Sequence, residues 1–388
     1  MTSPAARLGR LPVYPFAALT QRVREMNARG LDVINLDMGS PDMPPPPHVI
    51  ETLARSAANP LNHGYAGYKG IPEFRTAVAR YYDERFGVML DPETQVLPLM
   101  GSKEGIVNLI LAYVDQGDVV LTPDIGYPSY AMGALLAGGE PYYVPTPESG
   151  GYLPDLESVP LGIRQRAKIL WVNYPNNPTG ACADAAFYAQ AVAFCAEHDL
   201  LLASDHPYCD VTFDGYRAGS ALQAPGAFDH SIELISFSKS YNMAGWRLGA
   251  AVGSVAAIKT LLTVKSNMDS GHFRPVYDAG IAALETPSAW VEARNAVYQA
   301  RRDRILEMLP HIGLRGYVPK GALYIWAEVL SGTGVDYAEA ALTHARVSVA
   351  PGTFYGPGGT RHVRFSLCAE DARLEQALTR LKTWYASR

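Results

Sequence analysis

Two cationic residues stand eight positions apart in the stretch SFSKSYNMAGWRLG, Ser236 to Gly249. Lys239 follows the apolar run IELI, and Arg247 precedes the apolar run LGAAVG. A lysine amine that is held neutral by a dry or cationic setting can form a Schiff base with an aldehyde. A guanidinium can bind a phosphate through two parallel hydrogen bonds. Taken alone, a lysine between two serines is more often a solvated loop residue. The rest of the sequence must therefore show whether Lys239 has a chemical role.

Polar side chains follow each of four short apolar runs that read as strands. The runs are VVLT (119–122), ILWV (169–172), LLLA (200–203) and ELIS (233–236). Because the carboxyl ends of parallel strands share one edge of a sheet, these side chains are expected to face one crevice. Tyr127 follows the first run and Asn177 follows the second. Asp205 and Tyr208 follow the third run, Ser236 ends the fourth, and Lys239 comes just after it.

The chemistry of these residues predicts pyridoxal phosphate as the cofactor, because this aromatic aldehyde carries a ring nitrogen, a ring hydroxyl and a phosphate. Asp205 can hold a protonated ring nitrogen, Asn177 the ring hydroxyl and Tyr127 the flat ring. The stretch GSKEG, Gly101 to Gly105, opens a predicted helix whose N-terminus forms an anion site. Ser236 and Arg247 complete the predicted phosphate site.

The elements that must position these residues indicate an α/β fold. Continuous apolar strands alternate with helical segments such as 183–198, which predicts a mostly parallel sheet buried between helices. We predict a large cofactor-binding domain over residues 48–284 and a smaller α+β domain over residues 285–388. The N-terminal segment, residues 1–47, is predicted to join the small domain.

Composition excludes several classes of protein. The 388 residues carry a formal net charge of -5, which gives no support for nucleic-acid binding. No apolar run approaches the ~20 residues of a membrane helix, and no signal-peptide core is present. The four cysteines are scattered, so reduced thiols and a cytoplasmic location are expected. The histidines show no metal-ligand spacing, and no metal is predicted.

Four motifs together resemble the class I/II aminotransferases of pyridoxal-phosphate fold type I. They are NYPNNPTG, SDHPYCD, SFSKSYNMAGWRLG and VRFSLC, and the resemblance covers nearly the whole chain. It implies that Lys239 forms the internal Schiff base and carries the proton, with Asp205 at the pyridine nitrogen. It further implies roles for Asn177 and Tyr208 at the ring oxygen and for Tyr127 in stacking on the ring. Ser102, Lys103 (through its backbone), Ser236 and Arg247 resemble the phosphate cradle.

The resemblance also implies a homodimer that binds an amino acid and a 2-oxo acid. Tyr65, in YAGYKG, matches a tyrosine that reaches the phosphate in the neighbouring subunit. Arg364 matches the arginine that binds the substrate α-carboxylate, with Gly39 and Asn177 nearby. Each of these residues also has an ordinary interpretation. Asp205 could cap a turn, NNPTG could be only a turn, and Arg364 could pair with a structural carboxylate.

The finer pattern is most similar to bacterial LL-diaminopimelate aminotransferases and to their aspartate- or alanine-acting relatives. In the segment NMDSGHFR, Ser270 stands where dicarboxylate-specific enzymes place an arginine, which disfavours a strictly aspartate-specific enzyme. His272 or Arg274 could still contribute. Tyr14, Phe16 and Tyr324 are expected to line the pocket or to belong to the core. A carbon–sulfur lyase on the same fold is an alternative, and a non-enzymatic regulator is disfavoured.

Overall fold

The central element of the computed structural model, which describes residues 2–388, is a seven-stranded sheet with strand order β2-β8-β7-β6-β5-β3-β4. Strand β8 runs antiparallel to both of its neighbours, and the other strand pairs are parallel. The mostly parallel sheet predicted from the sequence is therefore confirmed. Its strands are β2 (Val96–Leu99), β3 (Val119–Pro123), β4 (Glu140–Val144), β5 (Ala167–Val172), β6 (Leu201–Asp205), β7 (Ser231–Ser236) and β8 (Gly249–Gly253).

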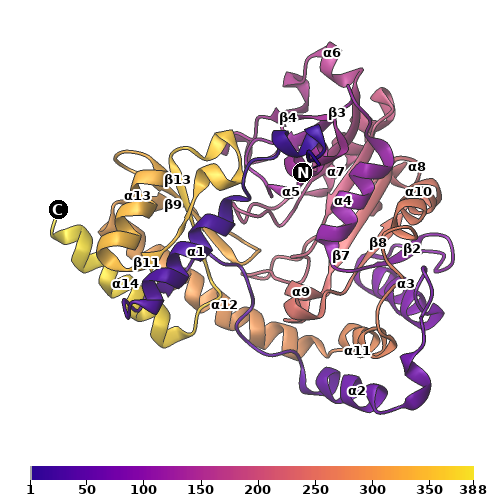
Figure 1. Ribbon diagram of the computed structural model, residues 1–388, viewed down its shortest axis with the longest axis horizontal. Helices are drawn as coiled ribbons and strands as arrows, with labels where there is room; N and C mark the ends of the chain where they lie inside the picture. Colours follow the sequence, from indigo (N-terminus) through magenta and orange to yellow (C-terminus); the bar gives the residue numbers. More distant parts are fainter. Residues whose placement is uncertain (1) are drawn as a thin grey trace.

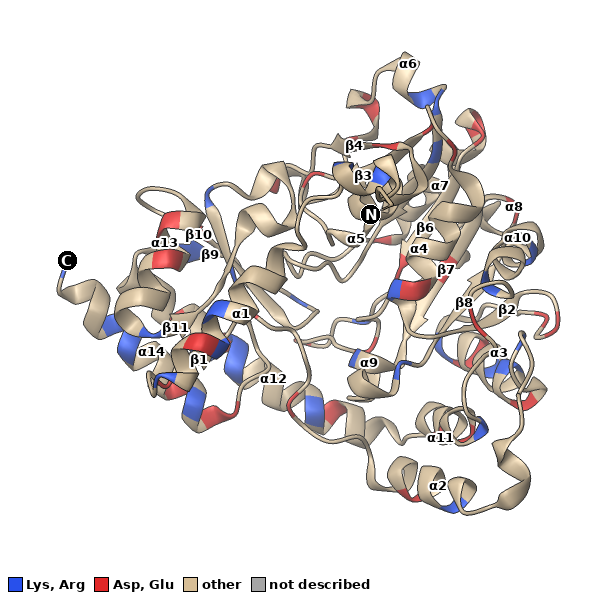
Figure 2. Ribbon diagram, viewed as in Figure 1, with Lys and Arg blue, Asp and Glu red and all other residues tan. Residues whose placement is uncertain are grey.

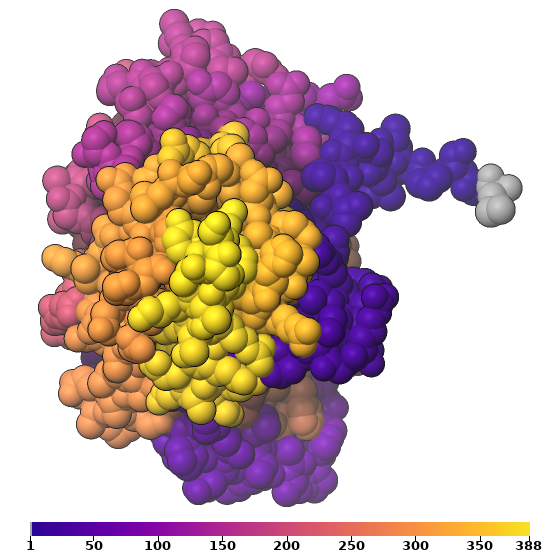
Figure 3. All heavy atoms as spheres, turned by 90° about the vertical axis from the view of Figure 1, so that its left-hand side faces the viewer, coloured from indigo at the N-terminus to yellow at the C-terminus, as the bar shows by residue number. Residues whose placement is uncertain are grey.

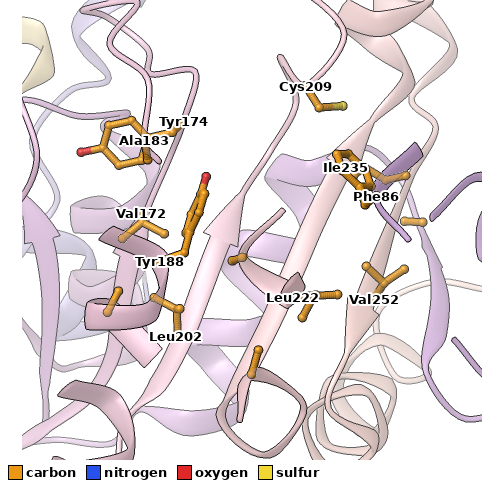
Figure 4. Close-up of a cluster of buried hydrophobic side chains, with 14 of the residues drawn as sticks. Phe86, Val172, Tyr174, Ala183, Tyr188, Leu202, Cys209, Leu222, Ile235 and Val252 are labelled. Atoms are coloured by element: carbon orange, nitrogen blue, oxygen red, sulfur yellow. The ribbon is translucent and has the colours of Figure 1, made fainter. Parts of the chain in front are cut away.

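Helices cover both faces of this sheet, which explains why its strands are apolar without alternation. Side chains alternate between the faces, so that Leu170 and Val172 join one core cluster while Ile169 and Trp171 join another. Figure 4 shows Val172, Leu202, Ile235 and Val252 projecting from neighbouring strands on the first of these faces. The covering helices are α3 (Pro72–Phe86), α7 (Ala185–His198) and α11 (Arg274–Leu284) on that face, and α4 (Ser102–Tyr113), α5 (Ser129–Ala137) and α10 (Val255–Lys265) on the other.

A second, smaller sheet has four antiparallel strands in the order β12-β13-β10-β9. It has its own apolar core, and Figure 1 shows it beside the central sheet, with a long helix running beneath both. The strands are β9 (Leu314–Gly316), β10 (Tyr324–Val329), β12 (Ala350–Pro351) and β13 (His362–Ser366). The packed helices are α12 (Ser288–Met308), α13 (Gly334–Ala340) and α14 (Asp371–Ala386).

The N-terminal part of the chain packs against this smaller sheet before it returns to the larger one. Strand β1 (Ile34–Asn35) pairs in parallel with β11 (Val347–Ser348), and helix α1 (Pro15–Ala28) contributes Arg22 to an ion pair with Glu339. Figure 3 shows the first residues, in indigo, projecting beyond the body of the molecule, while α14, in yellow, covers the smaller sheet. The chain then reaches α2 (Pro47–Ala57), which packs on α11.

Short helices complete the fold, and one of them, α9 (Phe237–Ser240), carries Lys239 directly after β7. The other two are α6 (Leu161–Arg164) and α8 (Ala227–His230). Acidic and basic residues are interspersed over the outer helices (Figure 2), in keeping with the small net charge. Between residues 2 and 388, none of the helices has both the length and the apolar character that spanning a membrane requires.

Candidate active site

One cavity of about 390 Å³ lies where the carboxyl ends of β3, β5, β6 and β7 meet the smaller sheet. The residues assigned to cofactor or substrate binding in the sequence analysis converge on it, with a single exception. Those that line it are Gly39, Ser102, Lys103, Tyr127, Asn177, Asp205, Tyr208, Ser236, Lys239, Arg247 and Arg364. Tyr14, Phe16 and Tyr324, which were expected either in the pocket or in the core, also line it.

Tyr65 is the exception, because it does not line the cavity of its own chain. Its side chain is 92% exposed and lies between the turn at residues 60–63 and helix α3. A single chain therefore leaves this predicted phosphate contact outside the cavity.

Lys239 reaches into the cavity and donates a hydrogen bond from Nζ to the carbonyl oxygen of Gly39. A side chain at position 39 would overlap the Tyr324 ring, so only glycine allows the backbone to lie this close to that ring. Burial lowers the pKa of Lys239 to about 8, and the nearby guanidinium groups of Arg364 and Arg247 act in the same direction. The fold therefore leaves a much larger fraction of this amine in the neutral, nucleophilic form at physiological pH than an exposed lysine has.

Asp205 ends strand β6 and is buried in the floor of the cavity. Its Oδ2 accepts a hydrogen bond of 2.8 Å from the hydroxyl of Tyr130, whereas its Oδ1 has no partner within residues 2–388. Burial raises the pKa of this carboxyl to about 7, against the hydrogen bond from Tyr130. A buried carboxylate oxygen without a donor is costly, so the site calls for a bound group that donates there.

Arg364, on strand β13, is buried but has no carboxylate within ion-pair distance in the described part of the chain. Its terminal nitrogens donate to Asn177 Oδ1 at 2.8 Å and to the carbonyl oxygen of Asp37, while Nε has no partner among residues 2–388. The guanidinium carbon lies 3.9 Å from the centroid of the Tyr324 ring. Arg364 therefore makes no direct ion pair among residues 2–388, although the Asp37 carboxylate lies close enough to interact with its charge, and its unpaired donor suits a bound anion.

The phosphate side of the cavity combines a helix N-terminus with hydroxyl groups and a guanidinium. Helix α4 begins at Ser102, directly after Gly101, whose φ of +80° is unfavourable for other residues. A side chain at Gly101 would overlap the Arg247 guanidinium, which donates to the carbonyl of Ala244 at 2.9 Å. Ser236 caps α9 through its hydroxyl and also lines the cavity. Free backbone N–H groups, hydroxyls and a cation form a setting that suits a phosphate.

Several residues that the sequence analysis missed support this site. Tyr130 binds Asp205, and Asn173 donates to the Asp205 carbonyl at 2.6 Å while accepting from the backbone N–H of Asn177 at 2.7 Å. Asn173 directly follows strand β5, so its position after a strand could have identified it. Tyr130 lies on a helix, and Tyr355 comes from the smaller sheet region, so only the folded chain reveals their contribution to the site.

His206 and Pro207, which directly follow Asp205, lie on two different sides of the sheet edge. Pro207 lines the cavity, whereas His206 is buried behind it with Nδ1 at 3.3 Å from Glu233. The Glu233 carboxylate also accepts hydrogen bonds from Tyr82, Ser204 and Ser220. Although burial disfavours the ionised form, His206 and these donors lower the pKa of Glu233 to about 2. The buried charge of Glu233 is thereby satisfied.

Comparison with known proteins decides the family. The sequence model of the family described as aminotransferase class I and II matches residues 31–381. This chain belongs to the class I and II aminotransferases. LL-diaminopimelate aminotransferases from Moorella thermoacetica and Dehalococcoides mccartyi are 46% and 44% identical to this aminotransferase, and each alignment covers 97% of both chains. The solved structure of a probable N-succinyldiaminopimelate aminotransferase from Thermus thermophilus superposes with a TM-score of 0.90, at 36% identity, over 95% of this chain and 99% of that one.

The aminotransferase has the pyridoxal-phosphate fold type I and uses pyridoxal phosphate as its cofactor. The residues present fit that group. The unpartnered Oδ1 of Asp205 suits a protonated pyridine nitrogen, the opening of α4 with Arg247 suits a phosphate, and the Lys239 amine suits an aldehyde.

The lowered pKa of Lys239 predicts how cofactor loading depends on pH. Because only the neutral amine reacts, the loading rate of the cofactor-free protein should rise roughly tenfold per pH unit and level off above about pH 8. An amine at the ordinary value of 10.5 would show no plateau in this range. Stopped-flow absorbance after mixing with pyridoxal phosphate, between pH 6 and 9.5, measures the profile. A rate that is still rising at pH 9.5 would contradict the prediction.

Proposed function

We propose that this aminotransferase transfers an α-amino group from LL-diaminopimelate to a 2-oxo acid. The observation that carries the proposal is that Lys239, Asp205 and Arg364 meet in one cavity of a chain 46% identical to an LL-diaminopimelate aminotransferase over nearly its full length. Besides Arg364, and apart from Lys239 and Arg247, which are assigned to the cofactor, Lys103 places a further cation in the cavity lining, and its Nζ lies 4.4 Å from the Tyr14 ring centroid. Two cations suit a substrate that carries a carboxylate at each end.

Bound pyridoxal phosphate supplies the aldehyde and the electron sink of the reaction. We assign Lys239 as the amine that would hold the aldehyde and that, as a free amine, would move a proton as a general base. A pKa near the working pH suits that role. Asp205 would hold the pyridine nitrogen, Asn177 and Tyr208 the ring oxygen, and Tyr127 one face of the ring. The Tyr208 hydroxyl is oriented by a hydrogen bond of 2.8 Å with Tyr324.

The phosphate would be held by Ser102, the backbone of Lys103, Ser236 and Arg247. The substrate α-carboxylate would bind Arg364, with Asn177 orienting the guanidinium and Gly39 leaving room beside it. Because Asn177 contacts Arg364 directly, the ring-binding and carboxylate-binding parts of the site are joined through one side chain.

Replacing Arg364 by glutamine should raise KM for the amino acid about 10- to 100-fold, because a charged hydrogen-bond pair is lost. Since cofactor binding uses other residues, the visible absorption of the bound cofactor should be kept. Arg361→Gln is the matched control, because Arg361 precedes the same strand, is exposed and pairs with Glu328. Steady-state kinetics of both variants test the assignment. An unchanged KM in Arg364→Gln would remove Arg364 from the substrate site.

The substrate proposal is tested by adding single amino acids to the cofactor-loaded protein without any oxo acid. With LL-diaminopimelate the visible band of the bound cofactor should disappear fastest, as the amino group stays on the cofactor. Glutamate, aspartate and alanine complete the panel. If aspartate or alanine removed the band fastest, that amino acid would replace LL-diaminopimelate as the proposed donor. Accumulation of ammonia together with a 2-oxo acid, while the band returns, would instead identify a lyase.

We propose a homodimer in which Tyr65 contacts the phosphate in the partner's site. The side chains around it form an exposed apolar patch, defined here as Leu61, Tyr65, Tyr68, Met268 and Phe273. The two segments of this patch meet, since the rings of His63 and Phe273 lie 5.2 Å apart. Exposed apolar clusters of this kind favour an interface. Light scattering coupled to gel filtration tests the proposal, and a fully active monomer would overturn it.

His272 and Arg274, which flank Phe273 of the patch, do not line the cavity of their own chain. His272 hydrogen-bonds the carbonyl of Arg247 at 2.7 Å, and Arg274 pairs with Glu73 at 3.3 Å. Ser270, two residues before His272, stands where dicarboxylate-specific enzymes are expected to place an arginine, which supports a donor other than aspartate alone.

We further propose that residues 48–284 form one unit and that residues 1–47 and 285–388 form a second. The two main apolar clusters, each of which takes a few residues from across the boundary, and the pairing of β1 with β11 support this division. A cytoplasmic location is proposed from the free thiols of all four cysteines.

A further inference from the structure

Helix α12 carries three buried arginines, and one of them lacks the charge partners of the others. Arg301 pairs with Asp42 at 2.9 Å and with Asp371 at 2.7 Å, and Arg302 pairs with Asp214 at 2.5 Å and with Asp303 at 2.7 Å. Arg294 is 3% exposed, and no carboxylate among residues 2–388 lies within ion-pair distance of it. A buried cation without a balancing carboxylate is costly, so a specific contact must justify it.

The Arg294 guanidinium instead binds three backbone carbonyls next to the active site. It donates to the carbonyl of Lys239 at 3.1 Å, to that of Ser240, and to that of Asp210 at 2.5 Å. The first two belong to the short helix α9, whose last carbonyls have no donor within the helix. Asp210 lies two residues after Tyr208. One guanidinium therefore joins the segment of Lys239 to the segment of Tyr208.

Asn295 fixes the orientation of this guanidinium. The Oδ1 atom of Asn295 accepts hydrogen bonds from Arg294 Nε at 3.1 Å and from Arg294 Nη2 at 2.7 Å. Its Nδ2 donates to the Asp210 carbonyl at 2.9 Å. The Asp210 carboxylate faces the other way, toward Tyr81 at 2.8 Å and Arg85 at 3.3 Å. Apart from the Asn295 amide oxygen, Arg294 thus donates to backbone carbonyls, and these contacts set its geometry without forming a direct ion pair.

We infer that Arg294 is a positioning residue for Lys239, which it ties to helix α12. The inference rests on the proposed role of Lys239. Seven residues further along the same helix, Arg301 contacts Asp42 of the N-terminal segment and Asp371 at the start of α14. A displacement of α12 against the central sheet is therefore transmitted to the Lys239 carbonyl, and hence to the direction of its side chain. Arg294 thereby couples the position of the smaller sheet to the orientation of the Lys239 side chain.

The test compares Arg294→Gln with Arg302→Gln, a control that is equally buried on the same helix but outside the cavity. In Arg294→Gln we expect kcat to fall about 10- to 100-fold while KM stays within about 3-fold, because the amine is misplaced rather than the substrate site. The cofactor-free protein should also show a changed pH profile of Lys239 modification by a small amine-reactive reagent, read by peptide mass spectrometry. The groups facing Lys239 that shape this profile are Cys368, Arg364 and Arg247.

In Arg302→Gln we expect a lower Tm, with kcat and the modification profile within about 2-fold of the unsubstituted protein. Arg294→Lys keeps the charge but not the fork of donors, and should restore part of kcat. The inference is overturned if Arg294→Gln and Arg302→Gln lower kcat equally, or if the modification profile of Arg294→Gln is unchanged.

If Arg294→Gln does not fold, Asn295→Ala carries the same readouts, because it frees the guanidinium while keeping the charge. We expect a loss in kcat of about 3- to 10-fold, and an unchanged kcat with an unchanged modification profile would overturn the inference. Failure of the proposed function would look different. If Lys239 were not the reacting amine, Lys239→Ala itself would keep its turnover, whatever the Arg294 variants do.

Discussion

Replacement of Lys239 by alanine should reduce transamination by about 10⁴-fold or more, because one side chain supplies both the amine for the cofactor and the base for proton transfer. Lys239 is the lysine side chain that reaches both the cavity and the carbonyl of Gly39. The variant should still bind pyridoxal phosphate, because Asp205, Ser236 and Arg247 stay in place. Equilibrium dialysis for the cofactor and single-turnover kinetics for the reaction measure the two effects separately.

Lys168→Ala is the matched control for this variant, because Lys168 is a half-exposed lysine on β5 outside the cavity. Its turnover should match that of the unsubstituted enzyme. A small primary amine added to Lys239→Ala should recover part of the rate, since the missing general base is then supplied from solution. Normal turnover in Lys239→Ala without added amine would disprove the assigned mechanism.

Replacement of Asp205 by asparagine should lower kcat by about 10²- to 10³-fold, the loss expected when a preorganised electrostatic contact is removed. The amide keeps the size of the side chain and can still meet Tyr130, but it cannot carry the negative charge that a protonated ring nitrogen requires. Steady-state kinetics measure the loss. Asp229→Asn, an exposed change on α8, serves as the control and should leave kcat unaltered.

The same substitution should not destabilise the cofactor-free protein, which separates its functional effect from misfolding. Burial raises the pKa of Asp205 from 3.8 to about 7, so the folded chain binds this proton more tightly than the unfolded chain does. The contribution of this proton to the free energy of unfolding is fully present below pH 3.8 and is lost as the pH rises toward 7. Asparagine has no such dependence. Thermal unfolding at pH 5 and pH 8 should therefore show a smaller decrease in Tm for Asp205→Asn, and a larger decrease would refute this account.

Binding of the cofactor should invert that comparison. Under the proposed role of Asp205, bound pyridoxal phosphate would supply a donor to the unpartnered Oδ1 and so favour the ionised form. At pH 8 the unsubstituted protein should thus gain more in Tm from the cofactor than Asp205→Asn gains.

The sequence by itself determined the elements and the residues that stand at their ends. Apolar runs such as ILWV and LLLA are buried on both faces, so they predict central parallel strands without reference to the rest of the chain. Asp205 ends one such strand, and Lys239 lies three residues after the end of another. Because every parallel strand delivers its end to the same edge, strand position alone was sufficient to place both residues in one cavity.

Only the tertiary structure decided which side chains meet once elements distant in the sequence have packed. Whether Arg364 has a carboxylate partner depends on strand β13 lying beside Asp37 and Asn177, which are 327 and 187 residues away. Tyr130 and Arg294 lie on helices, where periodicity reports which face is buried but not what that face touches. The reason is physical: hydrophobic patterning fixes local structure and burial, whereas the partners of a buried polar group are set by how the two sheets and helix α12 come together.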